Sequence, residues 1–229
     1  MSPEQYDAWY RTSRGAWIGE IERRLLCEAL APSPAESLID VGCGTGYFTR
    51  RFARDGLAVT GVDGDRGALD FARTHAAAGE RYLPADARRL PFPDRSFDLC
   101  VSVAALCFVA EESQALAEML RVTRRRFAIG LLNRHSLLFL QKGRHGGRGA
   151  YRGARWHTIA EAKALFAVTP ARDVTVSSAV FLPSGGPGAQ LLERWLPGGL
   201  PFGAFLVATG ALGERGKSDP SYPGGASFA

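Results

Sequence analysis

Short apolar runs and helical spacings alternate along the whole chain. Between residues 16 and 30, apolar side chains return every three or four positions, which predicts an amphipathic helix. Further helices are predicted at 47–54, 65–78, 111–122 and 158–166, and strands at 37–41, 57–62, 81–84, 97–103, 126–132, 174–178 and 205–209. This regular alternation predicts an α/β fold: a doubly wound, mostly parallel sheet with helices on both faces.

The pattern contains no internal repeat, so we expect a single domain over residues 1–212. Residues 1–35 precede the first strand, and we expect them to form a helical lid. Residues 134–157 form a Gly- and Arg-rich insertion after the strand at 126–132. The tail at 213–229 is rich in Gly, Ser and Pro, which is typical of disorder.

Composition narrows the class of protein. With 229 residues, 46% of them hydrophobic, the chain can bury one core of ordinary size. Its first residues do not resemble a signal peptide, and no apolar run approaches the roughly 20 residues of a membrane helix. The four cysteines lack CxxC spacing and are expected to be reduced thiols. We therefore expect a cytoplasmic protein without a membrane span.

The net charge of +5 is unevenly distributed. Between residues 119 and 160 there are ten basic residues and no Asp or Glu, so the rest of the chain is net acidic by about five charges. The most concentrated part is the basic loop at 142–155. Such a local excess favours an anionic substrate, an acidic partner or nucleic acid at one place. A solvated connector is the alternative interpretation of this loop.

A glycine-rich loop follows the first predicted strand. It contains Gly42, Gly44 and Gly46, and such loops bring bare backbone close to a nucleotide. An ATP-binding loop is excluded because no Lys-Ser or Lys-Thr pair follows. The spacing also does not fit a dinucleotide, because Tyr47 lies where the third glycine belongs. Asp40, just before the turn, would repel a pyrophosphate but suits a ligand with an ammonium group.

Two more acids follow the next two strands. Asp63 can accept the hydroxyls of a ribose, and Asp86 can accept an adenine amino group. Each could instead cap a local turn. One acid at each of three successive strand ends, together with the glycine loop, predicts a nucleoside ligand that carries positive charge and no phosphate. S-adenosylmethionine is such a ligand.

The segments LIDVGCGTGYF, VTGVDGD, ADARRLPFPDRSFDLCVS and LAEMLRVTRRRFAIGLLN, within residues 36–133, resemble the class I S-adenosylmethionine-dependent methyltransferases, of the small-molecule type related to the quinone-biosynthesis methyltransferases. The resemblance implies seven strands with the last antiparallel, and S-adenosylhomocysteine as a product. It implies cofactor contacts from Asp40, Gly42, Gly44, Gly46, Asp63, Gly64, Asp86, Ala87 and Ala104. Two departures, the apolar exit of the fourth strand and Arg124–Arg126 before the fifth, leave the methyl acceptor open.

The acceptor site is less defined than the cofactor site. Tyr6, Trp9 and Tyr10 could be core anchors or a lid over the acceptor, and Tyr151 and Trp156 could be aromatic walls.

The catalytic residues also remain open. His135 and His157 are candidates for a general base, although transfer from a sulfonium often needs only alignment. No metal site is expected, because these histidines have no compact ligand spacing.

Three functions remain. The first is methyl transfer to a small, possibly anionic, molecule. The second is methylation of RNA or protein through the basic loop, with nucleic acid the less favoured partner. The third is a non-catalytic module that binds S-adenosylmethionine. The sequence does not define the methylated atom or the oligomeric state.

Overall fold

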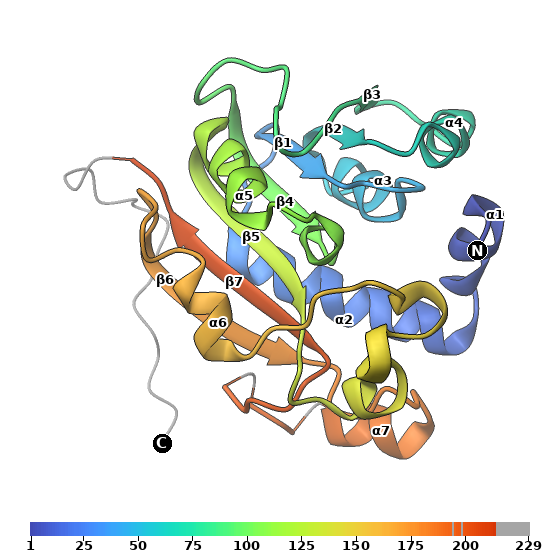
Figure 1. Cartoon of the computed structure of the whole chain (residues 1–229). Helices are drawn as coiled ribbons and strands as arrows, with labels where there is room; N and C mark the ends of the chain where they lie inside the picture. The colour runs from blue at the N-terminus through green and yellow to red at the C-terminus, as the bar shows by residue number, and fades with distance from the viewer. Residues whose placement is uncertain (194, 198, 214–229) are drawn as a thin grey trace.

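One seven-stranded sheet forms the centre of the computed structural model, which describes residues 1–193, 195–197 and 199–213 (Figure 1). The strands are β1 (Ser37–Val41), β2 (Ala58–Asp63), β3 (Glu80–Pro84), β4 (Phe97–Val103), β5 (Thr123–Leu132), β6 (Arg172–Ala179) and β7 (Phe205–Ala211). Their order across the sheet is β3-β2-β1-β4-β5-β7-β6. The first five pair in parallel, and β7 runs antiparallel to both of its neighbours. The predicted fold class is confirmed.

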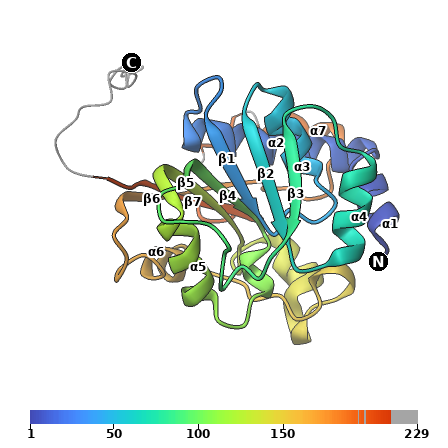
Figure 2. The ribbon, with the colours of Figure 1, turned by 90° about the horizontal axis from the view of Figure 1, so that it is seen from above.

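Helices cover both faces of this sheet. They are α1 (Pro3–Trp9), α2 (Ser13–Leu30), α3 (Tyr47–Arg54), α4 (Arg66–Thr74), α5 (Glu112–Arg121), α6 (Ile159–Ala164) and α7 (Pro187–Glu193). Short helical turns are η1 (Leu106–Phe108), η2 (Phe139–Gly143), η3 (Arg144–Gly146) and η4 (Gly149–Tyr151). α2 and α3 lie on one face, and α5 and α6 lie on the other (Figure 2). The core lies between these layers, where Leu38, Ile39 and Phe127 are fully buried.

Local hydrogen bonds explain where several helices begin. Ser2 and Gln5 form a capping box at the start of α1, and Thr158 and Glu161 form another at α6. The Asp65 side chain accepts two backbone N–H groups at the start of α4. These bonds satisfy amide groups that have no partner inside the helix.

The parallel register brings the carboxyl ends of β1, β2 and β3 together at one end of the sheet. Val41 of β1 pairs with Val62 of β2, and Asp63 pairs with Pro84 of β3. Carboxyl ends of parallel strands are where open α/β sheets bind ligands. The glycine loop and two of the three predicted acids, Asp63 and Asp86, therefore meet at this end.

Some elements differ from the sequence prediction. The short helix α7 and the turns of the 134–157 insertion were not expected, because segments rich in Pro and Gly carry little periodicity. α2 contacts β5, β6 and β7, so most of residues 1–35 belong to the layer that covers the sheet. Only α1 and the adjoining Tyr10 remain as a possible lid. Beyond Gly213, the predicted disordered tail lies outside the described residues.

No helix among the described residues has the length and apolar character needed to cross a membrane. The four cysteines are all free thiols, three of them buried. Burial raises the pKa of Cys100 and of Cys107 to about 12, which keeps both thiols protonated.

Candidate functional site

A cavity of about 730 Å³ opens at the carboxyl ends of β1, β2 and β3. Of the residues predicted to bind a cofactor, those that line it are Gly42, Asp63, Gly64, Asp86 and Ala87. Ala105, Leu106 and Phe108, which follow β4, form a further part of its wall. The cavity therefore combines carboxylates and bare backbone with apolar walls, as small-molecule sites do.

Close packing and backbone conformation require the glycines of the loop. Gly42 has φ +77°, and a Cβ there would collide with the side chain of Ala105. Gly46 has φ +78°, and a Cβ there would collide with the hydroxyl group of Tyr82. At Gly44, with φ +53°, a Cβ would meet nothing within 4 Å. The first two glycines thus fit the loop against its neighbours, and Gly44 leaves open space.

Asp63 ties the end of β2 to the glycine loop. Its Oδ2 accepts the backbone N–H of Gly44 at 2.7 Å, and its Oδ1 accepts that of Asp65 at 2.8 Å. Each carboxylate oxygen can accept a second hydrogen bond. The Asp63 side chain lines the cavity and can still accept two more hydrogen bonds there, which is what a pair of ribose hydroxyls would need.

Asp86 is held by Arg88. The guanidinium of Arg88 donates to both oxygens of Asp86 and also bonds Glu111 at 2.7 Å. Hydrogen bonds from the Arg88 side chain and backbone lower the pKa of Asp86 to about 2. The carboxylate is therefore charged at neutral pH, with a fixed orientation at the cavity wall.

Asp40 lies deeper than the other two acids. It is buried, and the hydroxyl of Thr49 donates to its Oδ2 at 2.6 Å. Burial raises the pKa of Asp40 to about 7, and the charge of Asp63 contributes to the rise. Asp40, Gly44 and Gly46 do not line the cavity wall, so their direct contact with a cofactor stays a prediction.

A second cavity, of about 390 Å³, lies beside the first. Phe108 lines both of them. Ala104 lines the second, and its neighbour Ala105 lines the first. The exit of β4 therefore separates two adjoining cavities, and Ala104 belongs to the second rather than to the predicted cofactor wall.

Aromatic side chains form much of the second cavity. Four of the five residues predicted to contact a substrate lie in its wall: Tyr6, Trp9, Tyr10 and Tyr151. Trp156 does not reach the wall, because it is buried behind Tyr151 and packs against Phe139.

Neither candidate general base lies in either cavity. His135 is exposed, and its backbone N–H bonds to the side chain of Asn133. His157 is buried, with Nε2 3.0 Å from a carboxylate oxygen of Glu112. Within the described ranges, no three His, Cys, Asp or Glu side chains gather closely enough to hold a metal ion.

The sequence prediction missed two charged residues of the second cavity, Arg14 and Glu22 of α2. Lys142 and Arg148, which also line it, belong to the basic loop that was predicted as a site for an anion. Arg14, Ile18 and Glu22 are four residues apart, which places them on one face of the helix. That spacing is visible in the sequence, but only the fold reveals which face of α2 borders a cavity.

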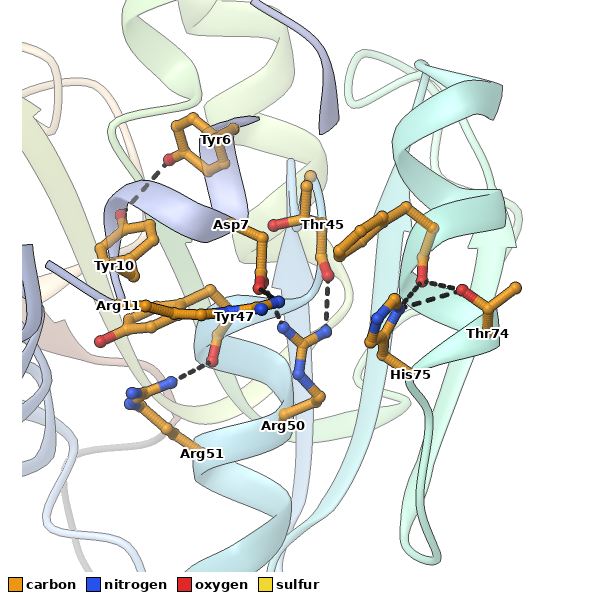
Figure 3. A network of polar contacts seen from close by, with 12 residues as sticks. Tyr6, Asp7, Tyr10, Arg11, Thr45, Tyr47, Arg50, Arg51, Thr74 and His75 are labelled. Carbon is orange, nitrogen blue, oxygen red and sulfur yellow. Dashed lines mark hydrogen bonds and ion pairs between the residues drawn. The ribbon is translucent and has the colours of Figure 1, made fainter. Parts of the chain in front are cut away.

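An ion pair fixes α1 against the glycine loop (Figure 3). Arg50 donates to Asp7 at 2.6 Å and to the backbone carbonyl of Thr45 at 2.6 Å. Nearby, the ring of Tyr10 stacks on that of Tyr47, with centroids 3.5 Å apart. The aromatic residues of the N-terminus are therefore positioned by the same loop that borders the first cavity.

Comparisons with known proteins agree with this geometry. Residues 39–127 match the model of a family described as a methyltransferase domain. A malonyl-[acyl-carrier protein] O-methyltransferase from Serratia marcescens is 44% identical over 91 residues, which are 40% of this chain and 35% of that protein. A demethylmenaquinone methyltransferase from Renibacterium salmoninarum is 37% identical over 102 residues, which are 44% of this chain and 43% of that protein. The chain thus spans less than half the length of these curated relatives.

A solved structure with the same fold covers most of the chain. It is a S-adenosylmethionine-dependent methyltransferase from Thermotoga maritima, described as a possible histamine N-methyltransferase. Its TM-score is 0.72 at 24% identity, and the match covers 91% of this chain and 95% of that one. At this identity the likeness shows a shared fold, and the family match shows that residues 39–127 of the chain carry a methyltransferase domain.

Proposed function

We propose that the protein transfers a methyl group from S-adenosylmethionine in the first cavity to a small molecule in the second. The observation that carries this proposal is the shared wall at Phe108, with Ala104 and Ala105 facing opposite sides. Two adjoining cavities allow a donor and an acceptor to be held in contact, and such alignment supplies much of the rate enhancement of a displacement.

The lining of the first cavity fits the cofactor. Asp63 has the free acceptor capacity for ribose hydroxyls, and Asp86 can accept from an adenine amino group. S-adenosylmethionine supplies, when bound, a methyl group activated by an adjacent sulfonium. The chain orients the nucleoside through these carboxylates, and the apolar residues after β4 exclude water from the reacting centre.

The second cavity supports an acceptor with an apolar ring and an anionic group. Its walls carry the aromatic residues named above, and Arg14, Lys142 and Arg148 supply positive charge. No ion pair joins these three cations to an acid among the described residues. They are thus available to a carboxylate or phosphate of the acceptor.

The distribution of charge favours a small molecule over RNA. Five of the ten basic residues between 119 and 160 pair with acids of this chain: Arg121, Arg124, Arg125, Arg134 and Arg155. Their charge is therefore largely neutralised inside the molecule. Lys142 and Arg148 of the insertion border the second cavity, where they suit an anionic ligand of limited size.

Methyl-labelled S-adenosylmethionine tests the proposal directly. We expect labelled small molecules when the protein is incubated with the low-molecular-weight fraction of a cell extract. Replacing Lys142 and Arg148 with Gln should reduce labelling of anionic products while S-adenosylhomocysteine still binds. Labelled RNA or protein instead, with binding that weakens steeply as salt increases, would favour the macromolecular alternative. Tight cofactor binding without any labelled product would favour a non-catalytic module.

A further inference from the structure

Among the residues that the structure describes, Glu22 is the one acid in the wall of the second cavity, and the function proposed above gives it no role. Within the described part of the chain, no hydrogen bond or ion pair reaches its carboxyl group. A carboxylate without a partner in a largely apolar wall is costly to maintain. A group of this kind at a cavity surface is a candidate for contact with a ligand.

The positions of Arg14 and Glu22 along α2 place a cationic and an acidic side chain at different points of the cavity wall. Arg14 is exposed, Ile18 is buried between, and Glu22 follows two turns further on. A helix rises 1.5 Å per residue, so the backbones of Arg14 and Glu22 are about 12 Å apart along the axis. The cationic end of the cavity is therefore separate from the carboxyl end.

Tyr6 lines the same cavity as Glu22 and is influenced by acids of both cavity regions. Burial raises the pKa of Tyr6, and the carboxylates of Glu22, Asp40 and Asp63 raise it further. The negative charges of Glu22 in the second cavity and of Asp40 and Asp63 near the first therefore all reach Tyr6. An acceptor held at Arg14 by its anionic group would extend its other end toward Glu22.

We propose that Glu22 accepts the proton of an acceptor hydroxyl during methyl transfer, which makes the substrate class an anionic, ring-bearing hydroxyl compound. The inference rests on the proposed function. The acceptor oxygen forms a bond to the methyl carbon while the carbon–sulfur bond breaks, and the electron pair of that bond stays on sulfur. The hydroxyl proton passes to a carboxylate oxygen of Glu22, so charge and atoms balance.

The chemistry of Glu22 suits this role. Burial raises its pKa to about 8, which brings the group into the range where a base operates efficiently near neutral pH. The other titratable groups near Glu22 are tyrosines from α1, the α1–α2 junction, α3 and η4: Tyr6, Tyr10, Tyr47 and Tyr151. Burial raises the pKa of each of these phenols above the ordinary value of 10, so they stay protonated while Glu22 titrates.

Three cationic side chains line the same cavity, those of Arg14, Lys142 and Arg148, and so does the N-terminal residue Met1. All of them are unchanged in a Glu22→Gln variant. A difference between wild type and this variant therefore reports Glu22 alone.

The first test is the titration of Glu22 itself, which needs no substrate. The protein is labelled with ¹³C at glutamate side-chain carboxyls, and wild type is compared with Glu22→Gln. We expect a carboxyl resonance that titrates near pH 8 in wild type and is missing from the variant. If every glutamate resonance titrates below about pH 6, near the ordinary range, the inference is overturned.

The second test is methyl transfer as a function of pH. With labelled S-adenosylmethionine and the low-molecular-weight extract, wild type should form O-methyl products at a rate that rises with pH toward a plateau above about 8. Glu22→Gln should lower the rate by about 100-fold or more and abolish its rise with pH. The affinity for S-adenosylhomocysteine should stay within about twofold of wild type. Glu28→Gln is the matched control, because Glu28 lies on α2 with a side chain 65% exposed and lines neither cavity.

The outcomes separate this inference from the proposed function. O-methyl products with the same pH profile in Glu22→Gln, or products methylated only on nitrogen, carbon or sulfur, contradict the role of Glu22 and leave the proposed function intact. Absence of any labelled product at any pH contradicts the proposed function itself, and the role of Glu22 with it.

Discussion

Asp7 and Arg50 form a largely buried ion pair of 2.6 Å that joins α1 to the helix following the glycine loop (Figure 3). Arg50 also donates to the carbonyl of Thr45 inside that loop. One guanidinium therefore connects the wall of the second cavity with the loop at the first. This contact makes the position of α1 depend on the glycine loop that borders the first cavity.

Removing one partner of this pair should destabilise the protein. In Asp7→Ala the guanidinium of Arg50 keeps its charge and its bond to the Thr45 carbonyl but loses its carboxylate partner, so we expect a loss of about 3 kcal/mol in the free energy of unfolding. Urea denaturation measures it. The control is Asp70→Ala, whose exposed pair with Arg73 should cost less than about 1 kcal/mol. Equal losses in both variants would contradict a structural role for the Asp7–Arg50 contact.

Gly42 should tolerate alanine less well than another glycine with positive φ. Gly56 has φ +90° with open space around a Cβ, so Gly56→Ala carries only backbone strain of about 1 kcal/mol. Gly42→Ala adds the collision with Ala105, and overpacking of this kind costs about 1–3 kcal/mol more. Unfolding in urea and titration with S-adenosylhomocysteine compare the two. Equal stability of the variants would show that the loop yields to the extra methyl group.

Asp63→Ala should weaken binding of S-adenosylhomocysteine by at least about tenfold, because it removes a charge-assisted acceptor from the cavity and also frees the amide of Gly44. Asp63→Asn should lie between this variant and wild type, since one oxygen can still accept from Gly44. Isothermal titration measures the affinities. Unchanged affinity in Asp63→Ala would remove Asp63 from the cofactor site.

The sequence predicted Asp63 and Gly42 in the wall of the first cavity but missed Glu22 in the wall of the second, for a physical reason. Asp63 and Gly42 follow strands directly, and parallel strands bring their carboxyl ends together wherever the rest of the chain lies. Glu22 lies on the polar side of an amphipathic helix, where a glutamate is ordinarily solvated. It borders a cavity only because α1 and the insertion around Tyr151 close over that face of α2. Such contacts depend on distant segments that local periodicity does not encode.

Ion pairs between distant segments were also not predictable from the sequence. The basic stretch after residue 119 suggested a site for anions, and nothing local indicated that Arg125 would meet Glu36 at 2.8 Å. The sequence also gave no sign that Arg88 would orient Asp86. Long side chains find partners across elements, and their pairing follows from tertiary structure.

Glu22→Gln should stabilise the protein at alkaline pH and have little effect at acidic pH. The folded-state pKa of Glu22, about 8, lies above the ordinary value of 4.5, so the folded state holds a proton that the unfolded chain has lost. The associated stability is fully present below about pH 4.5 and is lost as the pH rises to about 8. The neutral glutamine avoids this loss. One pKa unit corresponds to about 1.36 kcal/mol, and the partial exposure of Glu22 reduces the effect through solvent screening. Between about pH 5 and pH 9, we therefore expect the free energy of unfolding of the variant to rise by more than about 1 kcal/mol relative to wild type. Urea denaturation at both pH values measures the gain, with Glu28→Gln as control. A difference between Glu22→Gln and wild type that stays constant with pH would mean that Glu22 titrates as an ordinary surface carboxyl group.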